Sequence, residues 1–479
     1  MIRDFVVSNV CMRSILRLTK SSDWYLILAF MTFLIGCNSE PAPPVTSNPS
    51  ISVPVKVEKI IPAGNEKYLV LDSDHIFNQN ELYTFELNLP ESNLASINAN
   101  PAAEQYVEGS ITFNGETLSP VGIRYKGSIG AFVNCLSGTD WSNPSGYKTC
   151  TKLSIKVKIN WDDTDDKFYG LKKLQFHSQN LDPTHMRERL GYWLFREMGV
   201  PAPRSVHARL IINGTYSGVY ALTEQIDGRF TRQNFEDGTG NLYKEVWPLN
   251  MNGQPQSAQT FLNHLKTNEE GNPSAILIRT FAEEIAGSGS EEIQSVISKW
   301  MNVEQIISFA VVDRSIRADD GPFHWYCRGG FCSNHNYFWY EDPTESKLHL
   351  IPWDLDNALE NLLENVNPVT PIADEWGQIT SDCEPFSYGL FLGLQRSAAC
   401  DKLTAGWVSF EDEYKQTLDQ FKQGPFSESQ VNSLLDFWQN QIRSSVLEAS
   451  QHHSDALHES DWDDAVEYLK SGLTVARKK

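Results

Sequence analysis

The sequence predicts an α+β protein with a β-rich first half and a mainly helical second half. Alternating apolar and polar residues, which mark strands, recur between about residues 66 and 223. Apolar residues at helical spacing recur from about residue 255 onward. The chain has 479 residues, 41% of them hydrophobic, so it is long enough for one large domain or two smaller ones.

The N-terminal segment resembles a bacterial lipoprotein signal. Basic residues precede thirteen mostly apolar residues, 24–36, a core too short to span a bilayer comfortably. The core ends in Leu-Ile-Gly-Cys, so the resemblance implies a signal peptide over residues 1–36 and lipidation of Cys37; a short anchor helix with a chance cysteine is the alternative. Residues 37–60 are Pro-rich and predict an extended tether. We therefore expect an extracytoplasmic protein, lipid-anchored to a bacterial membrane such as the outer membrane or the cell surface.

The charge balance bears on the partners of the chain. The formal net charge is −21, and residues 1–36 carry four basic and two acidic groups, so the remaining chain carries −23, which is −21 minus +2. Such an acidic chain is not expected to bind nucleic acid. If it binds ATP, local Lys, Arg or metal ions must offset the phosphates. The absence of G-x-S-x-G and H-E-x-x-H motifs leaves serine and zinc hydrolases without support.

Six cysteines beyond the signal segment fall into three sequence-local pairs. Export would allow them to oxidise, and nearest-neighbour pairing is one of 15 possible pairings of six cysteines. The predicted disulfides join Cys135 with Cys150, Cys327 with Cys332, and Cys383 with Cys400. The alternatives are free buried thiols or a zinc site that combines Cys327 and Cys332 with His453 and His458.

Four strands are predicted before the first long helix, at residues 83–89, 109–113, 121–125 and 152–159. Asn114-Gly115 follows the second strand as a turn signal. On the fourth strand Lys152, Lys156 and Lys158 lie on one face, opposite the apolar residues. The alternative without a functional role is that these lysines form a solvent-exposed strand face.

A helix, a hairpin and a series of further helices follow. Apolar residues recur at helical spacing from Met186 to Met198, with Asp182 or Thr184 as the predicted N-cap. Asn213-Gly214 then predicts a tight hairpin between strands at 205–212 and 215–223. Later helices are expected at residues 274–286, 291–300, 303–312, 410–421 and 427–449.

Acidic and amide residues between 319 and 357 form the main candidate site. Asp320 precedes a Gly, and Asn336 lies sixteen positions after Asp320. Asp354 and Asp356 follow an apolar run that predicts a buried strand. Carboxylate, amide and carboxylate oxygens suit Mg²⁺, and protein kinases present their catalytic and metal-binding residues in this order. The alternatives are a turn role for Asp320, a functional role for the adjacent Asp319, and helix capping for Asp354 and Asp356.

Short segments in a shared order resemble the spore-coat-protein-H (CotH) kinase family of atypical protein kinases. They are spread over roughly residues 80–360, at 124–128, 152–158, 168–174, 187–190, 212–214, 218–224, 240–244, 336–337 and 352–356. The resemblance implies a kinase-like, two-lobed fold. A β-rich N-lobe would cover residues 61–225, and a helical C-lobe would cover 226–479, with the metal-binding and catalytic segment at 313–357.

The same resemblance implies ATP with Mg²⁺ or Mn²⁺ as cofactors and assigns roles within that segment. Asp320 would accept the proton of the acceptor hydroxyl. Asn336 and Asp354 would hold the metal, and Asp356, two residues along a strand, would be a second ligand. An insertion separates Asp320 from Asn336, because kinases place these residues about five positions apart. A Cys327–Cys332 loop would pin the insertion back, or the insertion would disable the site.

The nucleotide-binding residues are implied in the first half. Lys126 begins a Gly-containing loop that would cover phosphates, although an ordinary turn would look the same. Lys156 is favoured among the strand lysines as a phosphate contact. Glu188 would pair with that lysine, but a helical wheel places it about 160° from the centre of the apolar stripe, on which Glu197 lies. Glu224 ends the hairpin, where backbone groups would hold the base.

The expected function is that of an exported protein kinase that transfers the γ-phosphoryl group of ATP to Ser or Thr of a surface or secreted protein. The alternative is a catalytically inactive, kinase-like surface lipoprotein with a binding or structural role, because extracytoplasmic compartments are poor in ATP.

Overall fold

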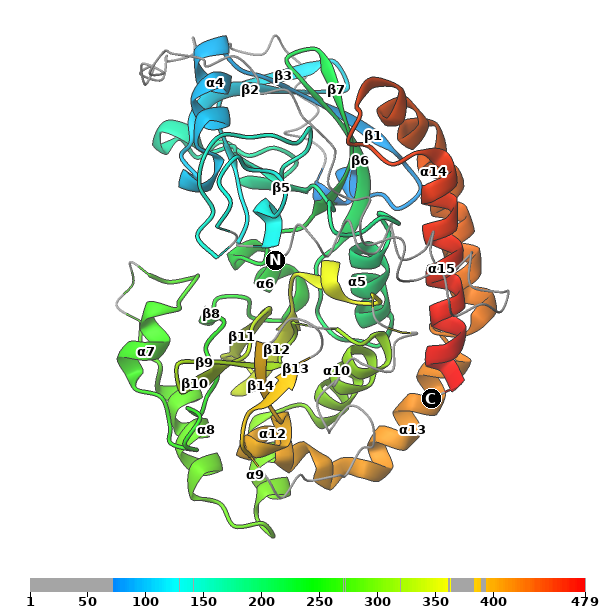
Figure 1. Cartoon of the computed structure of the whole chain (residues 1–479). Coiled ribbons are helices and arrows are strands. Elements are labelled where there is room, and N and C mark those ends of the chain that lie inside the picture. Colours follow the sequence, from blue (N-terminus) through cyan, green and yellow to red (C-terminus); the bar gives the residue numbers. More distant parts are fainter. Residues whose placement is uncertain are drawn as a thin grey trace, which may run out of the picture.

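The structure is a computed structural model that describes residues 72–128, 130–140, 142–269, 271, 273–318, 320–360, 362, 383–388 and 393–478. The predicted signal peptide, Cys37, the tether and Asp319 lie outside these residues. The fold is a mixture of helices and sheets, as the sequence predicted (Figure 1). No helix in the described ranges combines the length and apolar character that a bilayer crossing requires.

Seven strands close into a barrel in the order β1-β2-β3-β4-β5-β7-β6. The β1–β6 pair is parallel, and the other neighbours are antiparallel. The strands are β1 (Tyr83–Asn88), β2 (Val107–Phe113), β3 (Glu116–Tyr125), β4 (Ile155–Lys158), β5 (Lys173–His177), β6 (Ser205–Ile212) and β7 (Thr215–Thr223). The four strands and the hairpin predicted from sequence are confirmed in place, but β4 begins at Ile155, so Lys152 lies before the strand and not on its face, and β5 is additional.

Two tight turns and an alternating pattern shape the barrel. Asn114-Gly115 and Asn213-Gly214 all have positive φ angles, which two-residue hairpin turns require. Apolar side chains at alternate positions of every strand fill the barrel interior as one hydrophobic cluster. The other face carries polar side chains, because the register aligns Arg124 with Lys156 and Lys156 with Gln175. This polar face forms part of the candidate site.

The helical part of the molecule has its own hydrophobic core. Short helices within or beside the barrel are α3 (Ser73–Ile76), α4 (Glu91–Ala99) and α6 (Gly228–Asn234). The other helices are α5 (Arg187–Glu197), α7 (Ala258–Asn263), α8 (Ile276–Gly287), α9 (Ile293–Trp300), α10 (Val303–Ile316), α12 (Lys402–Trp407), α13 (Glu411–Gln423), α14 (Glu428–His452) and α15 (Glu459–Lys478). The later helices predicted from sequence are confirmed, with boundaries shifted by a few residues.

Helix α5 begins later than the sequence predicted. Asp182 accepts hydrogen bonds from the backbone of Thr184 and Arg187 at 2.9 and 2.8 Å, so its carboxylate organises the loop before the helix. Met186 is the N-cap and has no side-chain capping bond. The apolar side chains of α5, including Leu190 and Phe195, belong to the core of the helical part.

A three-stranded sheet, β12-β11-β8, lies within the helical part. It consists of β8 (Leu242–Lys244), β11 (Tyr337–Asp342) and β12 (Lys347–Pro352). Strands β11 and β12 form an antiparallel hairpin in which Tyr337 pairs with Pro352. This register brings the residue before β11, Asn336, close to the residues after β12, and Trp353 donates its backbone N–H to the Asn336 carbonyl at 3.0 Å.

The insertion folds as a hairpin of its own. Strands β9 (Trp325–Arg328) and β10 (Phe331–Ser333) pair across a Gly-Gly turn with positive φ, and β14 (Gly393–Arg396) and β13 (Phe386–Tyr388) extend them into a four-stranded sheet. The three predicted disulfides, Cys135–Cys150, Cys327–Cys332 and Cys383–Cys400, are confirmed. The zinc alternative is wrong, because Cys327 and Cys332 are bonded to each other.

The C-terminal helices brace both parts of the molecule. Figure 1 shows α13, α14 and α15 along one side, from the helical part up to the barrel. Arg209 on β6 pairs with Glu448 on α14 at 2.8 Å, and Tyr216 on β7 donates to the Ser445 carbonyl at 3.0 Å. Because these contacts reach barrel strands directly, α14 is packed as part of the main body of the protein.

Candidate active site

Asp320 and Asn336 are brought together despite the insertion. The Asn336 side-chain amide donates to an Asp320 carboxylate oxygen at 2.9 Å. The intervening hairpin pairs with β14, where Cys327 lies opposite Leu394, and its Tyr326 hydrogen-bonds to the Asp320 side chain. The sixteen-residue spacing is therefore accommodated without separating the two side chains that the sequence implicated.

An unusual backbone conformation recurs at this place. Asp320, Asn336, Asp354 and Glu245 have φ angles of 78°, 60°, 56° and 53°. Such positive φ values are uncommon outside glycine, although Asn and Asp adopt them more readily than other residues. Strained backbone tends to gather at functional sites, where the surrounding structure holds it in place. The proximity of four such residues is consistent with a functional site at this place.

Asp354 and Asp356 follow β12 and remain partly exposed. Asp354 precedes the short 3₁₀ helix Leu355–Asn357, but its side chain makes no capping hydrogen bond. Its backbone N–H donates to the Tyr192 hydroxyl at 2.9 Å, which fixes the main chain and leaves the carboxylate available. The capping alternative considered from sequence is thus not what this carboxylate does.

The acidic side chains perturb one another. Burial, and after it the charge of Asp354, raises the pKa of Asp320 to about 7. Burial also raises the pKa of Asp356 well above its ordinary value, with Asp354, Glu188 and Asp320 contributing. Accumulated negative charge of this kind favours a bound cation.

Oxygen ligands at this position fit Mg²⁺. Within the described residues, only one group of three His, Cys, Asp or Glu side chains has its ligand atoms all within 4.8 Å, and it does not include Asp320, Asp354 or Asp356. Mg²⁺ is commonly held by one or two carboxylates together with waters and phosphate oxygens. A compact cage made by the protein alone is therefore not required, and Asn336 and Asp354 suit a site that substrate completes.

A chain of three polar side chains links the barrel to α5. The Lys126 ammonium lies 2.7 Å from His177 Nε2, and His177 Nδ1 lies 2.7 Å from the Glu188 carboxylate. Thr223 also donates to Glu188, at 3.1 Å. Burial lowers the pKa of Lys126, opposed first by the charge of Asp354 and then by that of Glu188. Lys126 therefore lies within electrostatic range of both acidic groups.

The strand lysines separate into different environments. Burial, and after it the neighbouring cations Lys126, Lys173 and Arg124, lowers the pKa of Lys156 to about 7. No ion pair between Lys156 and a carboxylate occurs in the part of the chain that the structure describes. Such a concentration of positive charge suits an anionic ligand.

Lys152 and Lys158 have other contacts. Lys152 donates to the Val219 carbonyl at 2.7 Å and lies over the Tyr220 ring. Lys158 lies over the ring of Trp161. Lys126, in contrast, has Asp354 and Glu188 among the charges that act on it, and Lys156 lies within electrostatic range of Lys126.

The helical wheel was misleading for α5. Glu188 is 1% exposed, although the wheel placed it far from the apolar stripe, whereas Glu197 is exposed. The reason is that α5 is covered on more than one side, so polar residues at its start are buried as well. Glu188 faces His177 and Thr223 of the barrel, and Glu197 does not join this group.

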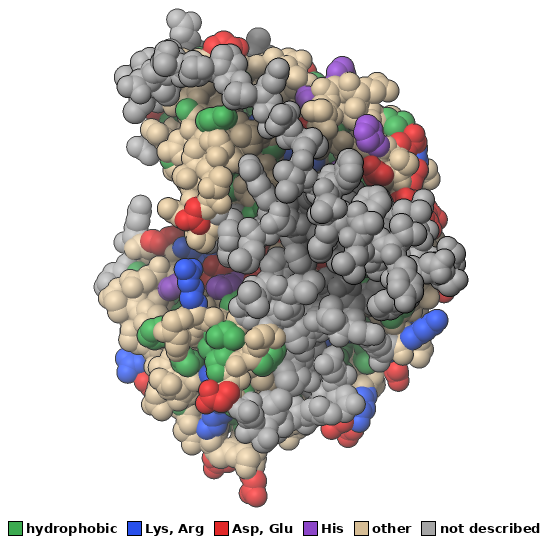
Figure 2. Space-filling view, in the orientation of Figure 1, with side chains coloured by type: hydrophobic (Ala, Val, Ile, Leu, Met, Phe, Trp, Pro, Cys, Tyr) green, Lys and Arg blue, Asp and Glu red, His purple; other side chains and the backbone are tan. Residues whose placement is uncertain are grey.

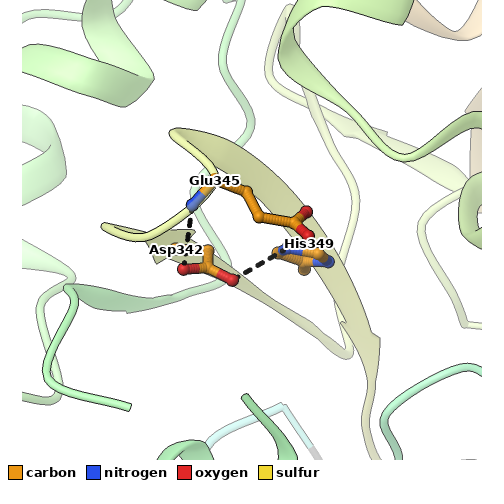
Figure 3. A group of neighbouring side chains, drawn as sticks. All are labelled: Asp342, Glu345 and His349. Atoms are coloured by element: carbon orange, nitrogen blue, oxygen red, sulfur yellow. Dashed lines mark hydrogen bonds and ion pairs between the residues drawn. The ribbon is translucent and has the colours of Figure 1, made fainter. Parts of the chain in front are cut away.

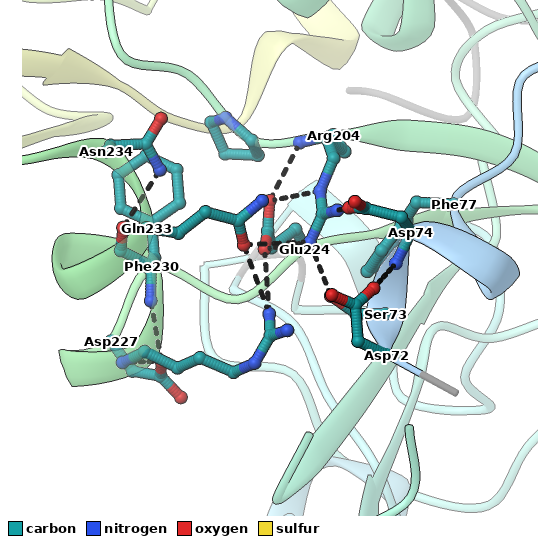
Figure 4. Close-up of polar contacts among 12 residues, drawn as sticks. Asp72, Ser73, Asp74, Phe77, Arg204, Glu224, Asp227, Phe230, Gln233 and Asn234 are labelled. Atoms are coloured by element: carbon teal, nitrogen blue, oxygen red, sulfur yellow. Dashed lines mark hydrogen bonds and ion pairs between the residues drawn. The ribbon is translucent and has the colours of Figure 1, made fainter. Parts of the chain in front are cut away.

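Glu224 has a structural contact of its own (Figure 4). Its buried carboxylate accepts from Arg204 Nη2 at 2.6 Å and from Nε at 3.0 Å. Arg204 also contacts Asp74 and Ser73 in α3. The Glu224 side chain at the end of β7 is therefore bound to Arg204, which in turn contacts α3.

A cavity of about 520 Å³ adjoins this connection. It is lined by the loop before β5 and by the segment from β7 into α6, with Lys173, Glu224, Asp227, Gly228 and Arg229 among the lining residues. Lys173 and Asp227 both act on the charge of Lys156, which places this cavity next to the basic cluster. Figure 2 shows acidic, basic and histidine side chains at the indentation where the barrel meets the helical part.

Sequence reasoning missed His177 and Glu245. His177 ends β5, a strand that was not predicted, so nothing marked its histidine as facing Lys126. Glu245 follows β8, contacts Lys244 at 3.3 Å and accepts weakly from the Asn336 backbone at 3.4 Å. The short segment Gly240–Lys244 was noticed only for its resemblance, and a positive φ at Glu245 leaves no clear signal in sequence.

A family model described as "CotH kinase protein" matches residues 123–474. This is 352 residues (474 − 123 + 1), nearly three quarters of the chain, and it includes the C-terminal helices. Inner spore coat protein H of Bacillus subtilis (strain 168) is 24% identical over 199 residues, which cover 40% of this chain and 50% of that protein. The inner spore coat protein H-like protein of the same organism is 36% identical over 63 residues, 13% of this chain and 20% of that protein. The chain thus spans half or less of the length of these curated relatives.

One solved structure aligns over most of the chain. It is a chain from the complex of the Shewanella oneidensis MR-1 toxin–antitoxin system HipA and HipB with its operator DNA. The alignment covers 81% of this chain and 79% of the other, at 12% identity and a TM-score of 0.26. A score this low carries no argument about the fold.

Proposed function

The chain belongs to the CotH kinase protein family, and from this membership and the geometry of the site we propose that it is an atypical protein kinase. It would transfer the γ-phosphoryl group of ATP to Ser or Thr hydroxyls of a surface or secreted protein. The barrel would act as the N-lobe and the helical part as the C-lobe, with the nucleotide between them.

The position of Lys126 carries this proposal. This lysine is linked through His177 to Glu188 on α5, and it also lies within electrostatic range of Asp354. Protein kinases use the same set of charges, a lysine placed between a helix glutamate and a metal-binding aspartate. The inserted histidine distinguishes the present arrangement. Lys126 and Lys156 together would offset the charge of the phosphates.

The acidic side of the site supplies the remaining roles. Asp320 is the proposed acceptor of the hydroxyl proton, and its pKa near 7 suits a group that gains and loses a proton at neutral pH. The Asn336 amide donates to one oxygen of that carboxylate, and Tyr326 also hydrogen-bonds to it, so its orientation is held. Asn336 and Asp354 would hold Mg²⁺ or Mn²⁺, with Asp356 as a further ligand. The ion, when bound, neutralises charge on the phosphate oxygens.

The nucleotide base would occupy the cavity of about 520 Å³ beside residues 224–228. Its volume is within the ordinary range of small-molecule sites. Backbone groups of this segment are the expected contacts, because the Glu224 carboxylate is bound to Arg204. Arg229 lines the same cavity and lies 3.7 Å from Glu224.

We also propose that the protein is exported and anchored through lipidated Cys37, and that its substrate is a protein outside the cytoplasm. The signal-like N-terminal sequence supports export. Three disulfides also support it, because such bonds persist mainly in oxidising compartments.

Thermal unfolding with ligands tests the proposed nucleotide site. A ligand that binds only the folded state at 100 times its Kd adds about 2.7 kcal/mol to the free energy of unfolding. We expect Mg²⁺ and ATP together to raise the Tm more than either alone, and Asp354→Asn to remove this extra gain. Asp464→Asn, which changes an exposed carboxylate on α15, is the matched control and should retain it. If Mg²⁺ with ATP leaves the wild-type Tm unchanged, a non-catalytic binding or structural role replaces the proposal.

A further inference from the structure

Three potential metal ligands meet at the closed end of the β11–β12 hairpin (Figure 3). Asp342 ends β11, Glu345 lies in the turn, and His349 lies on β12. One ligand atom from each residue lies within 4.8 Å of the other two. This end of the hairpin is opposite to the end that carries Asn336 and Asp354, because the two strands of six residues separate them.

His349 has a buried nitrogen without a hydrogen-bond partner. The residue is 5% exposed, and its Nε2 makes no hydrogen bond to any residue that the structure describes. Its Nδ1 lies 2.6 Å from the side-chain oxygen of Gln305 on α10. Since that oxygen accepts, Nδ1 carries the proton and Nε2 presents a lone pair. Metal-bound histidines typically have such an outer partner, which fixes the ring and its tautomer.

The two oxygens of the Asp342 carboxylate face different neighbours. One oxygen accepts from the Thr344 backbone at 2.8 Å, which stabilises the turn. The other oxygen lies 3.8 Å from His349 Nε2, which is too far for a hydrogen bond. Asp342 as a whole is only 4% exposed. The nearby Lys347 does not fill this gap, because its ammonium donates to the carbonyls of Ser298 and Met301.

We propose that Asp342, Glu345 and His349 bind a divalent transition-metal ion, with Zn²⁺ as the best match. Zn²⁺ binds imidazole nitrogen and carboxylate oxygen at about 2.0–2.2 Å, so two tetrahedral ligands are about 3.3 Å apart. The observed 3.8 Å between Nε2 and Oδ2 requires a closure of only a few tenths of an ångström. Glu345 is exposed and can swing to complete the set, with water as the fourth ligand.

The ion would stabilise the turn of the β11–β12 hairpin. The other end of this hairpin carries Asn336 and Asp354 of the candidate active site. Tyr340 pairs with His349 and Asp342 with Lys347 across the two strands. A metal that joins Asp342 to His349 therefore fixes this register. Its role is structural, and it does not depend on whether the protein transfers phosphate.

Metal titration of the full chain, purified without a polyhistidine tag and treated with chelator, tests the site. Saturating Mg²⁺ is included so that oxygen sites near Asp354 are occupied. Calorimetry with Zn²⁺ should give one tight site in the wild type, and Co²⁺ should give the visible absorption of a nitrogen- and oxygen-ligated ion. Both signals should be lost in His349→Ala and Asp342→Asn. Equal stoichiometry and affinity in the wild type and these variants would overturn the proposal.

Further variants guard against loss of folding at the buried positions. Glu345→Gln changes an exposed side chain and should weaken Zn²⁺ binding without affecting the Tm of the metal-free protein. Gln305→Ala should weaken it by about 10–100-fold, as removal of outer partners of metal-bound histidines typically does. His452→Ala removes an exposed histidine on α14 and should leave Zn²⁺ binding intact. Unchanged affinity in both Glu345→Gln and Gln305→Ala would equally contradict the site.

Discussion

The side chains of Asn336 and Asp320 are hydrogen-bonded at 2.9 Å although sixteen positions separate them in sequence. The residues between them form the disulfide-bonded β9–β10 hairpin, whose Tyr326 also hydrogen-bonds to Asp320. The insertion thus forms a sheet with β13 and β14, and the hydrogen bond between Asn336 and Asp320 is preserved. This geometry makes the site testable by single substitutions.

The raised pKa of Asp320 predicts an unusual dependence of stability on pH. Its pKa is about 7 in the folded protein and about 3.8 in the unfolded chain, so between these values the folded state holds the proton more tightly. The contribution of Asp320 is therefore fully present below pH 4 and is lost as pH rises towards 7, by at most about 1.4 kcal/mol per pH unit.

Asp320→Asn lacks this titration but retains an acceptor for Asn336. In metal-free urea unfolding at pH 5 and pH 8, we expect the variant to gain stability relative to the wild type as pH rises. A difference between the two proteins that does not change with pH would contradict the raised pKa.

Lys126 and Lys158 should differ sharply in their effect on catalysis. Lys126→Met removes the cation linked to His177 and Glu188, and we expect kcat/KM for ATP to fall by about 10²–10³-fold, the usual effect of losing one electrostatic contact to a transition state. Lys158→Met changes a lysine that lies over Trp161 and should leave kcat/KM within about twofold. Similar losses of kcat/KM in the two variants would contradict a specific role of Lys126, because they would show that the overall positive charge of the barrel supports the reaction.

The Arg204–Glu224 pair is expected to stabilise the fold without contacting nucleotide. Arg204→Ala would leave the buried Glu224 carboxylate without its main partner, and loss of one member of a buried pair typically costs about 3–5 kcal/mol. Urea unfolding measures this loss, and ATP titration of the folded variant should give an unchanged Kd. A weakened Kd with unchanged stability would instead make Glu224 a nucleotide ligand.

Two disulfides should contribute unequally to stability. Cys327–Cys332 closes a separation of 5 residues, and Cys383–Cys400 closes one of 17. Loop-closure entropy then predicts losses of about 2 and about 3 kcal/mol when each pair is replaced by Ser. Denaturant midpoints at constant m-value measure both losses. Equal losses, or a larger one for the shorter loop, would contradict this ordering.

Local patterns predicted much of the fold. The Asn-Gly turns at 114–115 and 213–214 and the strand alternation gave most of the barrel strands, and the later helices followed from apolar spacing. Barrel closure through the parallel β1–β6 pair could not be predicted, because it depends on strands that are distant in sequence. The burial of Glu188 was also unexpected, since a helical wheel describes one covered face and α5 is covered on several.

The candidate site was only partly visible in the sequence. Asp320, Asn336 and Asp354 stand out because acidic and amide residues adjoin turns and a buried strand. The link between Lys126 and Glu188 required His177, and this histidine becomes meaningful only when β5 lies beside β4 in the barrel. Positive φ at four clustered residues is likewise a tertiary property.

Transfer of labelled γ-phosphate from ATP tests the central proposal most directly. Wild-type protein and Asp354→Asn are incubated with Mg²⁺, labelled ATP and casein as a generic acceptor, and label in both the acceptor and the protein itself is counted. We expect incorporation by the wild type and a loss of about 10²-fold or more in Asp354→Asn, with an unchanged Tm without ligand, because the Asp354 carboxylate makes no capping bond. Equal incorporation by wild type and Asp354→Asn would contradict the assignment of this site as the phosphotransfer centre.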